Sequence, residues 1–241
     1  SVLPPNPGLP YSFGSLRVNS GASLTLQPGV IVKPLLTPDW SASLQVYGIL
    51  NANGTAGSPV IFTSLKDDAV GGDSNNDGST SSPAGNDWSG IQVNTGGAIT
   101  LANTTVRYGG YLSWANLYLN GGSLSLSNST VSNSGFDGVG GNGGNLSIQN
   151  SSISNNGLHG IGVASVTLDV QGSTVGSNGQ KGIMVNPSGA VTVTNSTISG
   201  NGSNGLQTAD VTALTVTGTT IISNTGYAAY LYFTNAPINI S

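Results

Sequence analysis

The sequence predicts an all-β fold in which a single chain winds into a right-handed parallel β-helix solenoid, with three strands per coil and about eight to nine coils. A four-residue phrase returns six times, at intervals of 22 to 25 residues. A repeat of this length without a helical pattern is typical of a solenoid. The copies begin with asparagine or glycine and lie at 103–106, 128–131, 150–153, 172–175, 195–198 and 218–221.

Each repeat contains three short apolar segments separated by polar corners. The phrase is followed by a corner such as 154–157, a Gly-apolar-x-apolar segment such as 160–163, and an alternating segment such as 191–193. Alternation of apolar and polar residues is typical of a strand with one buried face, and Gly, Asn and Ser favour turns. One coil cannot bury its inward residues alone, so coils must stack. Right-handed winding follows the usual preference of parallel connections.

Asparagine recurs at one corner of the predicted coil, so we expect its side chains to stack as an amide ladder. The residues concerned are Asn103, Asn128, Asn150 and Asn195.

The composition restricts the function classes. Charged residues make up 6% of the chain, all nine acidic residues are aspartate, and the net charge is −4. Because no basic cluster exists, we predict no nucleic-acid partner, and because no apolar run approaches about 18 residues, we predict no membrane insertion. The absence of cysteine excludes disulfides and thiolate metal sites.

The chain divides into a short N-terminal arm and one long solenoid. Residues 1–15 contain four prolines and predict an extended arm or the lid of the first coil. Residues 16–241 carry the strand pattern, which is interrupted at 65–87. We therefore predict that 65–87 forms a surface loop inserted into the β-helix.

Four stretches of the predicted coils share a recognisable pattern, namely 23–30, 48–55, 59–64 and 87–91. They resemble the coils of secreted right-handed parallel β-helix proteins of the broad pectate-lyase-like superfamily. The resemblance extends over nearly the whole chain and implies a location outside the cell or at its surface. That superfamily mixes lyases, hydrolases, adhesins and structural proteins, so the resemblance implies no single activity.

The inserted loop contains a candidate calcium site. Alternate side chains of 73–78 carry oxygen and are followed by a glycine, as in the first half of a calcium loop. The acidic residue expected at the twelfth position is absent, and Ala84 stands there. A solvated acidic loop is the alternative. The candidate ligands are Asp73, Asn75 and Asp77, with Asp67, Asp68 or Asp87 completing the set.

Aligning the coils places one polar residue before each Gly-apolar segment, namely Asp137, His159, Lys181 and Asn204. In a parallel β-helix these residues lie above one another, about 4.8 Å apart. We interpret Asp137, His159 and Lys181 as candidate catalytic residues for acid–base chemistry on a polysaccharide. Ordinary polar turn residues are the alternative. No second carboxylate faces Asp137, so the paired carboxylates of glycoside hydrolases are not visible.

An aromatic group suggests a second kind of site. Tyr108, Tyr111, Trp114 and Tyr118 lie in one long connection and are candidates for stacking on sugar rings. Covering a coil edge is the alternative role. Eight Asn-x-Ser/Thr sequons also make N-glycosylation possible if the host supports it.

The C-terminal segment is rich in tyrosine and ends within a strand pattern, with no polar cap. Solenoid ends without caps expose strand edges, so either the chain is cut from a longer one or another copy stacks on it. We therefore expect a secreted structural or adhesive protein that self-associates end to end. A protein that binds or degrades polysaccharide is the alternative function.

Overall fold

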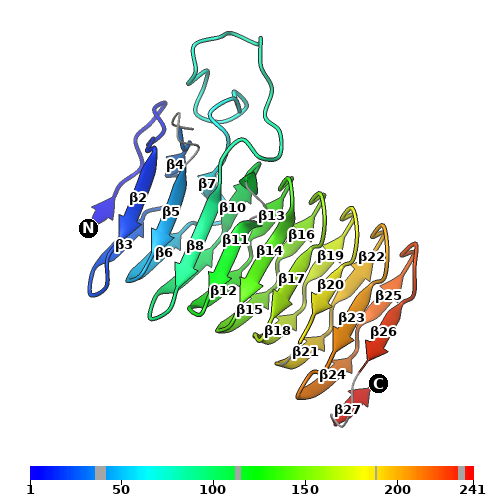
Figure 1. The fold of residues 1–241 in the computed structure, drawn as a ribbon. Coiled ribbons are helices and arrows are strands. Elements are labelled where there is room, and N and C mark those ends of the chain that lie inside the picture. The colour runs from blue at the N-terminus through cyan, green and yellow to red at the C-terminus, as the bar shows by residue number, and fades with distance from the viewer. Residues whose placement is uncertain (36–41, 112–114, 188, 233–236) are drawn as a thin grey trace.

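The chain folds into an elongated three-sided solenoid whose N- and C-termini lie at opposite ends (Figure 1). The computed structural model describes residues 1–35, 42–111, 115–187, 189–232 and 237–241. Each complete coil contributes one strand to each of three parallel sheets. The predicted all-β parallel β-helix with three strands per coil is therefore confirmed. No helix among the described residues is long and apolar enough to span a bilayer.

Strands from successive coils pair in parallel within each sheet. The ten-stranded sheet contains β1 (Val2–Leu3), β3 (Ser23–Leu26), β6 (Ile49–Asn53), β9 (Ala98–Ala102), β12 (Ser123–Ser127), β15 (Asn145–Gln149), β18 (Thr167–Gln171), β21 (Ala190–Thr194), β24 (Ala213–Thr217) and β27 (Ile238–Ile240). The eight-stranded sheet contains β4 (Ile31–Val32), β7 (Val60–Phe62), β10 (Thr104–Arg107), β13 (Thr130–Ser132), β16 (Ser152–Ser154), β19 (Thr174–Gly176), β22 (Thr197–Ser199) and β25 (Thr220–Ile222). The nine-stranded sheet contains β2 (Ser15–Val18), β5 (Ser43–Val46), β8 (Gly90–Asn94), β11 (Ala115–Asn120), β14 (Asp137–Asn142), β17 (Ile161–Ala164), β20 (Ile183–Val185), β23 (Leu206–Ala209) and β26 (Ala229–Tyr232).

The core is a set of aliphatic columns that run along the solenoid axis. In the ten-stranded sheet, Leu124, Leu146 and Leu168 stand directly above one another and are 1 to 2% exposed. The residues between the inward positions, such as Ser125 and Ser147, face outward in the same register. Because the side-chain period of a strand is two, this register keeps every aliphatic residue on the inner face.

The ten-stranded sheet gives about ten turns, slightly more than the eight to nine expected. The N-terminal segment accounts for part of the difference. Val2 pairs with Thr25, which adds β1 to the sheet. Further along, the backbone N–H of Tyr11 donates to Ile31 at 2.8 Å, and Phe13 packs against the core.

A ladder of hydroxyl groups explains why the second residue of the repeated phrase is serine or threonine. The hydroxyl of Ser151 accepts a hydrogen bond from the backbone N–H of Ser129 in the preceding coil, at 3.1 Å. It donates to the carbonyl of Gln149 in its own coil, at 2.7 Å. Each hydroxyl therefore satisfies two backbone groups at a corner where the strands stop. The ladder runs through Thr104, Ser129, Ser151, Ser173, Ser196 and Thr219.

An amide ladder exists, but different asparagines build it from those expected. The side-chain oxygen of Asn178 accepts from both the backbone N–H and the side-chain amide of Asn156, at 3.1 and 2.9 Å. Asn201 and Asn224 continue the pattern. The expected set instead adopts positive φ of 46 to 49°, a conformation that asparagine tolerates, and glycine takes the equivalent position at Gly172 and Gly218. That set is Asn103, Asn128, Asn150 and Asn195.

The region between β7 and β8 projects from one corner of the solenoid as a long loop (Figure 1). The structure assigns no strand to residues 63–89. The coil nevertheless stays in register, because β5 and β8 pair directly and Leu44 lies opposite Ile91. The insertion is therefore accommodated at a corner and leaves the coil stacking unchanged.

We predict that Ser151→Ala lowers the free energy of unfolding by about 1–3 kcal/mol, because the buried N–H of Ser129 loses its acceptor. Ser151→Thr keeps the hydroxyl and is expected to cost much less, since Thr219 fills the same column. The outward-facing Ser147→Ala is the control and is expected to change stability by less than about 0.5 kcal/mol. Denaturant unfolding of the three variants measures this, and equal losses for Ser151→Ala and Ser147→Ala would contradict the role of the ladder.

Candidate functional site

Asp137, His159 and Lys181, hereafter the polar column, occupy equivalent positions in three successive coils at the nine-stranded sheet. Val139, Ile161 and Ile183 are in register, and each residue of the polar column lies two positions before one of them. The alignment expected from the sequence spacing therefore matches the structure. His159 is 8% exposed, whereas Asp137 and Lys181 are partly exposed.

Backbone amides use the acceptor atoms of this column. The N–H of His159 donates to Asp137 Oδ1 at 2.9 Å, and the N–H of Lys181 donates to His159 Nδ1 at 3.2 Å. In the next coils, the N–H of Tyr227 donates to Asn204 Oδ1 at 2.9 Å. Because Nδ1 of His159 accepts a hydrogen bond, the proton of the neutral imidazole is assigned to Nε2.

Burial shifts the pKa values of the two ionisable acceptors in opposite directions. Burial raises the pKa of Asp137 to about 6, although the N–H of His159 and the charge of Lys181 act against this shift. Burial, together with the charge of Lys181, lowers the pKa of His159 to about 4. Near neutral pH, Asp137 is therefore ionised and His159 is neutral.

Two glycines lie beside the column on the outer side of the nine-stranded sheet. Outward positions in four successive strands are in register and hold Tyr118, Gly140, Gly162 and Met184. A Cβ atom on Gly162 would lie 2.5 Å from Asp137 Oδ2 and 3.0 Å from His159 Cδ2. The glycines therefore make room for Asp137 and His159, whose side chains lie over the strands between a tyrosine and a methionine.

The chemistry of the column is limited by these contacts. A general base needs a free lone pair, but Nδ1 of His159 accepts from the backbone and Nε2 carries the proton. Oδ1 of Asp137 is likewise engaged, which leaves Oδ2 beside the glycines. The arrangement can present a carboxylate oxygen, an imidazole N–H and an ammonium group to a polar ligand.

The described aromatic candidates come from different parts of the coil. Tyr108 has φ 66° and stands at a corner under the guanidinium of Arg107, which lies 5.3 Å from its ring centroid. Tyr111 is tied through its backbone N–H to the carbonyl of Trp88, and Tyr118 lies on β11 in register with Gly140. Trp114 lies outside the described residues. Tyr118 is therefore the aromatic candidate in the same sheet as the polar column.

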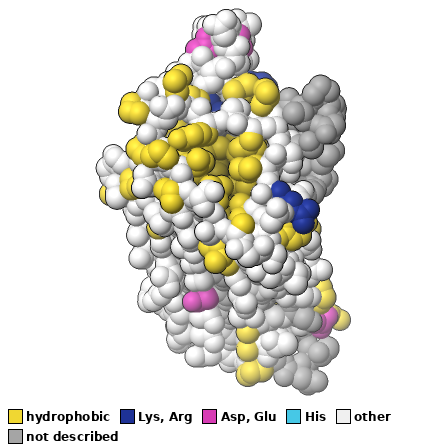
Figure 2. Space-filling model, turned by 90° about the vertical axis from the view of Figure 1, so that its left-hand side faces the viewer, with side chains coloured by type: hydrophobic (Ala, Val, Ile, Leu, Met, Phe, Trp, Pro, Cys, Tyr) yellow, Lys and Arg dark blue, Asp and Glu magenta, His cyan; other side chains and the backbone are white. Residues whose placement is uncertain are grey.

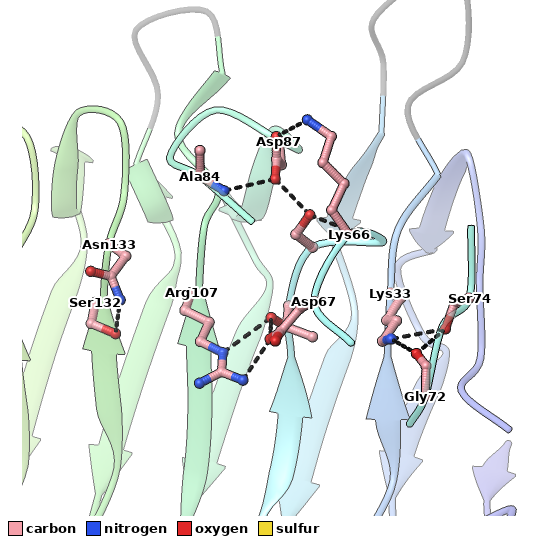
Figure 3. Close-up of polar contacts among 12 residues, drawn as sticks. Lys33, Lys66, Asp67, Gly72, Ser74, Ala84, Asp87, Arg107, Ser132 and Asn133 are labelled. Carbon is pink, nitrogen blue, oxygen red and sulfur yellow. Dashed lines mark hydrogen bonds and ion pairs between the residues drawn. The ribbon is translucent and has the colours of Figure 1, made fainter. Parts of the chain in front are cut away.

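Two cationic side chains of the solenoid, Arg107 and Lys33, anchor the acidic loop, residues 65–87, and a third, Lys66, forms an ion pair within the loop (Figure 3). Arg107 on β10 pairs with Asp67 at 2.5 Å, and Lys66 pairs with Asp87 at 2.7 Å. Lys33 donates to the carbonyl of Gly72 at 2.7 Å and to the hydroxyl of Ser74 at 2.8 Å.

Lys33 is fully buried, and the sequence analysis did not single it out. Burial lowers its pKa, while Asp67, Asp68 and Asp73 act in the opposite direction. One feature of the sequence could have pointed to Lys33. The lysine directly follows the apolar strand β4, and a charged side chain buried there requires a partner.

The structure separates the six candidate metal ligands into two groups. Carboxylate oxygens of Asp68, Asp73 and Asp77 lie within 4.8 Å of one another. Asn75 lies beside them, since its amide donates to Asp77 at 2.8 Å. Asp67 and Asp87 are engaged in ion pairs with Arg107 and Lys66 instead.

Comparison with known proteins identifies the fold. Residues 89–241 match a family model described as a right handed beta helix region. No curated protein and no solved structure matches the chain.

We predict that Asp137→Asn and His159→Asn change the pH dependence of stability in opposite directions. The folded state keeps the Asp137 proton up to about pH 6, so this group makes the free energy of unfolding fall as pH rises from about 4 to 6. The folded state excludes a proton from His159 down to about pH 4, so this group makes stability fall as pH drops from 6.5 to about 4. The two effects offset each other in the unmodified protein.

Asp137→Asn is therefore expected to gain stability from pH 4 to 6.5, and His159→Asn to lose stability from pH 4 to 6, each by up to about 3 kcal/mol. Asn204 shows that asparagine can act as the acceptor at this position. Denaturant unfolding at fixed ionic strength measures the slopes, and slopes of the same sign in both variants would contradict the assignment.

Proposed function

The chain belongs to the right-handed β-helix family, and we propose that it is an extracellular structural or adhesive protein whose copies stack end to end. The observation that carries this proposal is the exposure of apolar side chains and strand edges at both ends of the solenoid. Monomeric soluble proteins rarely leave large apolar patches beside unpaired strand edges.

The C-terminal end presents apolar and aromatic side chains on its last strands. Tyr227 and Tyr230 stack with ring centroids 5.9 Å apart and are 67% and 47% exposed. Ile240 on β27 is 57% exposed and Ile222 on β25 is 54% exposed. The strands β25, β26 and β27 each pair on one side only among the described residues.

The N-terminal end also presents apolar side chains. Figure 2 shows hydrophobic side chains gathered across this end of the molecule. A small cavity of about 20 Å³ opens among them. Its lining consists of Leu3, Tyr11, Phe13, Leu16, Leu24, Leu26, Val32, Leu44 and Phe62.

The geometry of a solenoid makes the two ends compatible. Translation of a second copy along the axis brings β27 next to β1 and β26 next to β2, each in the same sheet, and brings β25 next to residues 11–13, which already pair with β4. The pairs of β27 with β1 and of β26 with β2 are then parallel, like the pairs inside each copy. A head-to-tail contact of this kind does not close on itself, so it extends into a filament.

The junction is expected to be weaker than the contact between coils within a copy. The hydroxyl ladder ends at Thr219, whereas the corresponding positions of the first two coils hold Val30 and Val60, which are fully buried. Valine cannot accept a hydrogen bond from a corner amide. We therefore expect reversible, concentration-dependent association.

The unmodified chain is expected to form elongated particles whose sedimentation coefficient rises between micromolar and millimolar concentration. Ile222→Lys and Ile240→Lys place a charge on the exposed edge and are expected to weaken association by about tenfold or more. Thr192→Lys adds the same charge on the outer side of the solenoid and is the matched control. Sedimentation velocity and negative-stain images measure this, and a monomer at every concentration would overturn stacking.

A second candidate function is the binding or cleavage of a polysaccharide, favoured by the polar column in the sheet that also carries the outward-facing Tyr118 and Met184. The carboxylate oxygen of Asp137, the Nε2–H of His159 and the ammonium of Lys181 suit a polar sugar ring. A screen of acidic glycans for binding and for product release tests this candidate, with His159→Ala and Lys181→Ala as variants. Turnover that both variants lose would favour the enzyme over the structural role.

A further inference from the structure

We propose that the acidic loop binds one calcium ion through Asp68, Asp73 and Asp77, with Asn75 beside them. This site lies at the corner between β7 and β8 and is independent of the stacking proposed above. Its carboxylate oxygens lie within 4.8 Å of one another, close enough to contact one ion.

Unsatisfied oxygen atoms give a separate reason to expect a cation. Oδ1 of Asp68, Oδ1 of Asn75 and Oδ1 of Asp77 are buried without a hydrogen-bond partner. A buried acceptor without a donor costs about 1–3 kcal/mol. The three atoms belong to three of the four residues of the proposed site. One cation bound there can therefore supply the missing partner of several of these oxygens.

The charge balance of the loop also indicates a divalent ion. Two of its five carboxylates are neutralised in ion pairs, Asp67 by Arg107 and Asp87 by Lys66. Three carboxylates remain, and Lys33 is the remaining cation that acts on this region. The balance is therefore two negative charges, which one divalent cation neutralises.

The ligand chemistry selects calcium among the common divalent ions. The site offers carboxylate and amide oxygens, and neither nitrogen nor sulfur ligands are near, since the chain has no cysteine and its single histidine lies in the polar column. Zinc prefers nitrogen and sulfur ligands. Magnesium requires near-ideal octahedral geometry, whereas calcium accepts irregular sets of six to eight oxygens.

The loop is arranged so that binding needs little reorganisation. The carboxylate of Asp73 accepts from the backbone N–H groups of Asp77 and Gly78, at 3.2 and 2.8 Å, which curls the chain around the cluster. Lys33 holds Gly72 and Ser74 just before the turn. Asp73 is exposed, so an ion can reach the cluster from solvent.

Calorimetric titration of the full 241-residue chain with calcium chloride, in about 0.1 M salt, tests the proposal. We expect one ion per chain with a dissociation constant between about 10⁻⁵ and 10⁻³ M, weaker binding of magnesium, and a melting temperature that rises with calcium and falls with chelator. Asp68→Asn and Asp77→Asn are expected to weaken calcium binding by about tenfold or more.

Asp210→Asn is the matched control, because it removes an equal charge from an exposed corner outside the loop. Circular dichroism of each variant verifies that the β-helix is intact. Unchanged calcium affinity in both loop variants, or no heat and no shift in melting temperature at about 1 mM calcium, would overturn the proposal.

Discussion

The structure depends on how backbone amides are satisfied at the corners of the coil. Within the strands, every coil bonds to its neighbours through parallel pairing, but at a corner the chain turns and the ladder of strand bonds stops. Buried N–H groups left there would each cost a significant part of the protein's stability. Side-chain acceptors stacked in register solve this problem at two corners. Hydroxyls act between the ten-stranded and eight-stranded sheets, and asparagine amides together with the polar column and Asn204 act between the eight-stranded and nine-stranded sheets.

This arrangement gives a physical reason for the unusual composition. Serine, threonine and asparagine combine a short side chain with an acceptor, so they can reach the next coil's backbone without leaving the turn. Asparagine and glycine also tolerate the positive φ that occurs at all three corners. The corner positions of most coils are filled by short neutral side chains instead of charged ones, which agrees with a charged fraction of 6%.

The polar column and the acidic loop are the two places where ionisable groups depart from this regularity. In the column, Asp137 and His159 act as corner acceptors, so an unusual pKa at this position follows from burial in the ladder and does not by itself indicate catalysis. In the loop, three of the chain's five basic residues make polar contacts, Lys66 from within the loop and Arg107 and Lys33 from the solenoid. Arg107 and Lys33 tie the loop to the solenoid, and three aspartates of the loop remain clustered without an ion pair.

The sequence alone determined the period, the three strands per coil, the register of Asp137, His159 and Lys181, and the interruption at 65–87, because a solenoid converts linear spacing directly into vertical alignment. It did not determine which asparagines hydrogen-bond across coils or that Lys33 is buried. It also did not determine that Asp68 joins Asp73 and Asp77 while Asp67 and Asp87 form ion pairs. Those outcomes depend on side-chain direction and on contacts between the loop and distant strands. Spacing along one coil carries no information about them, so only the packed structure decided them.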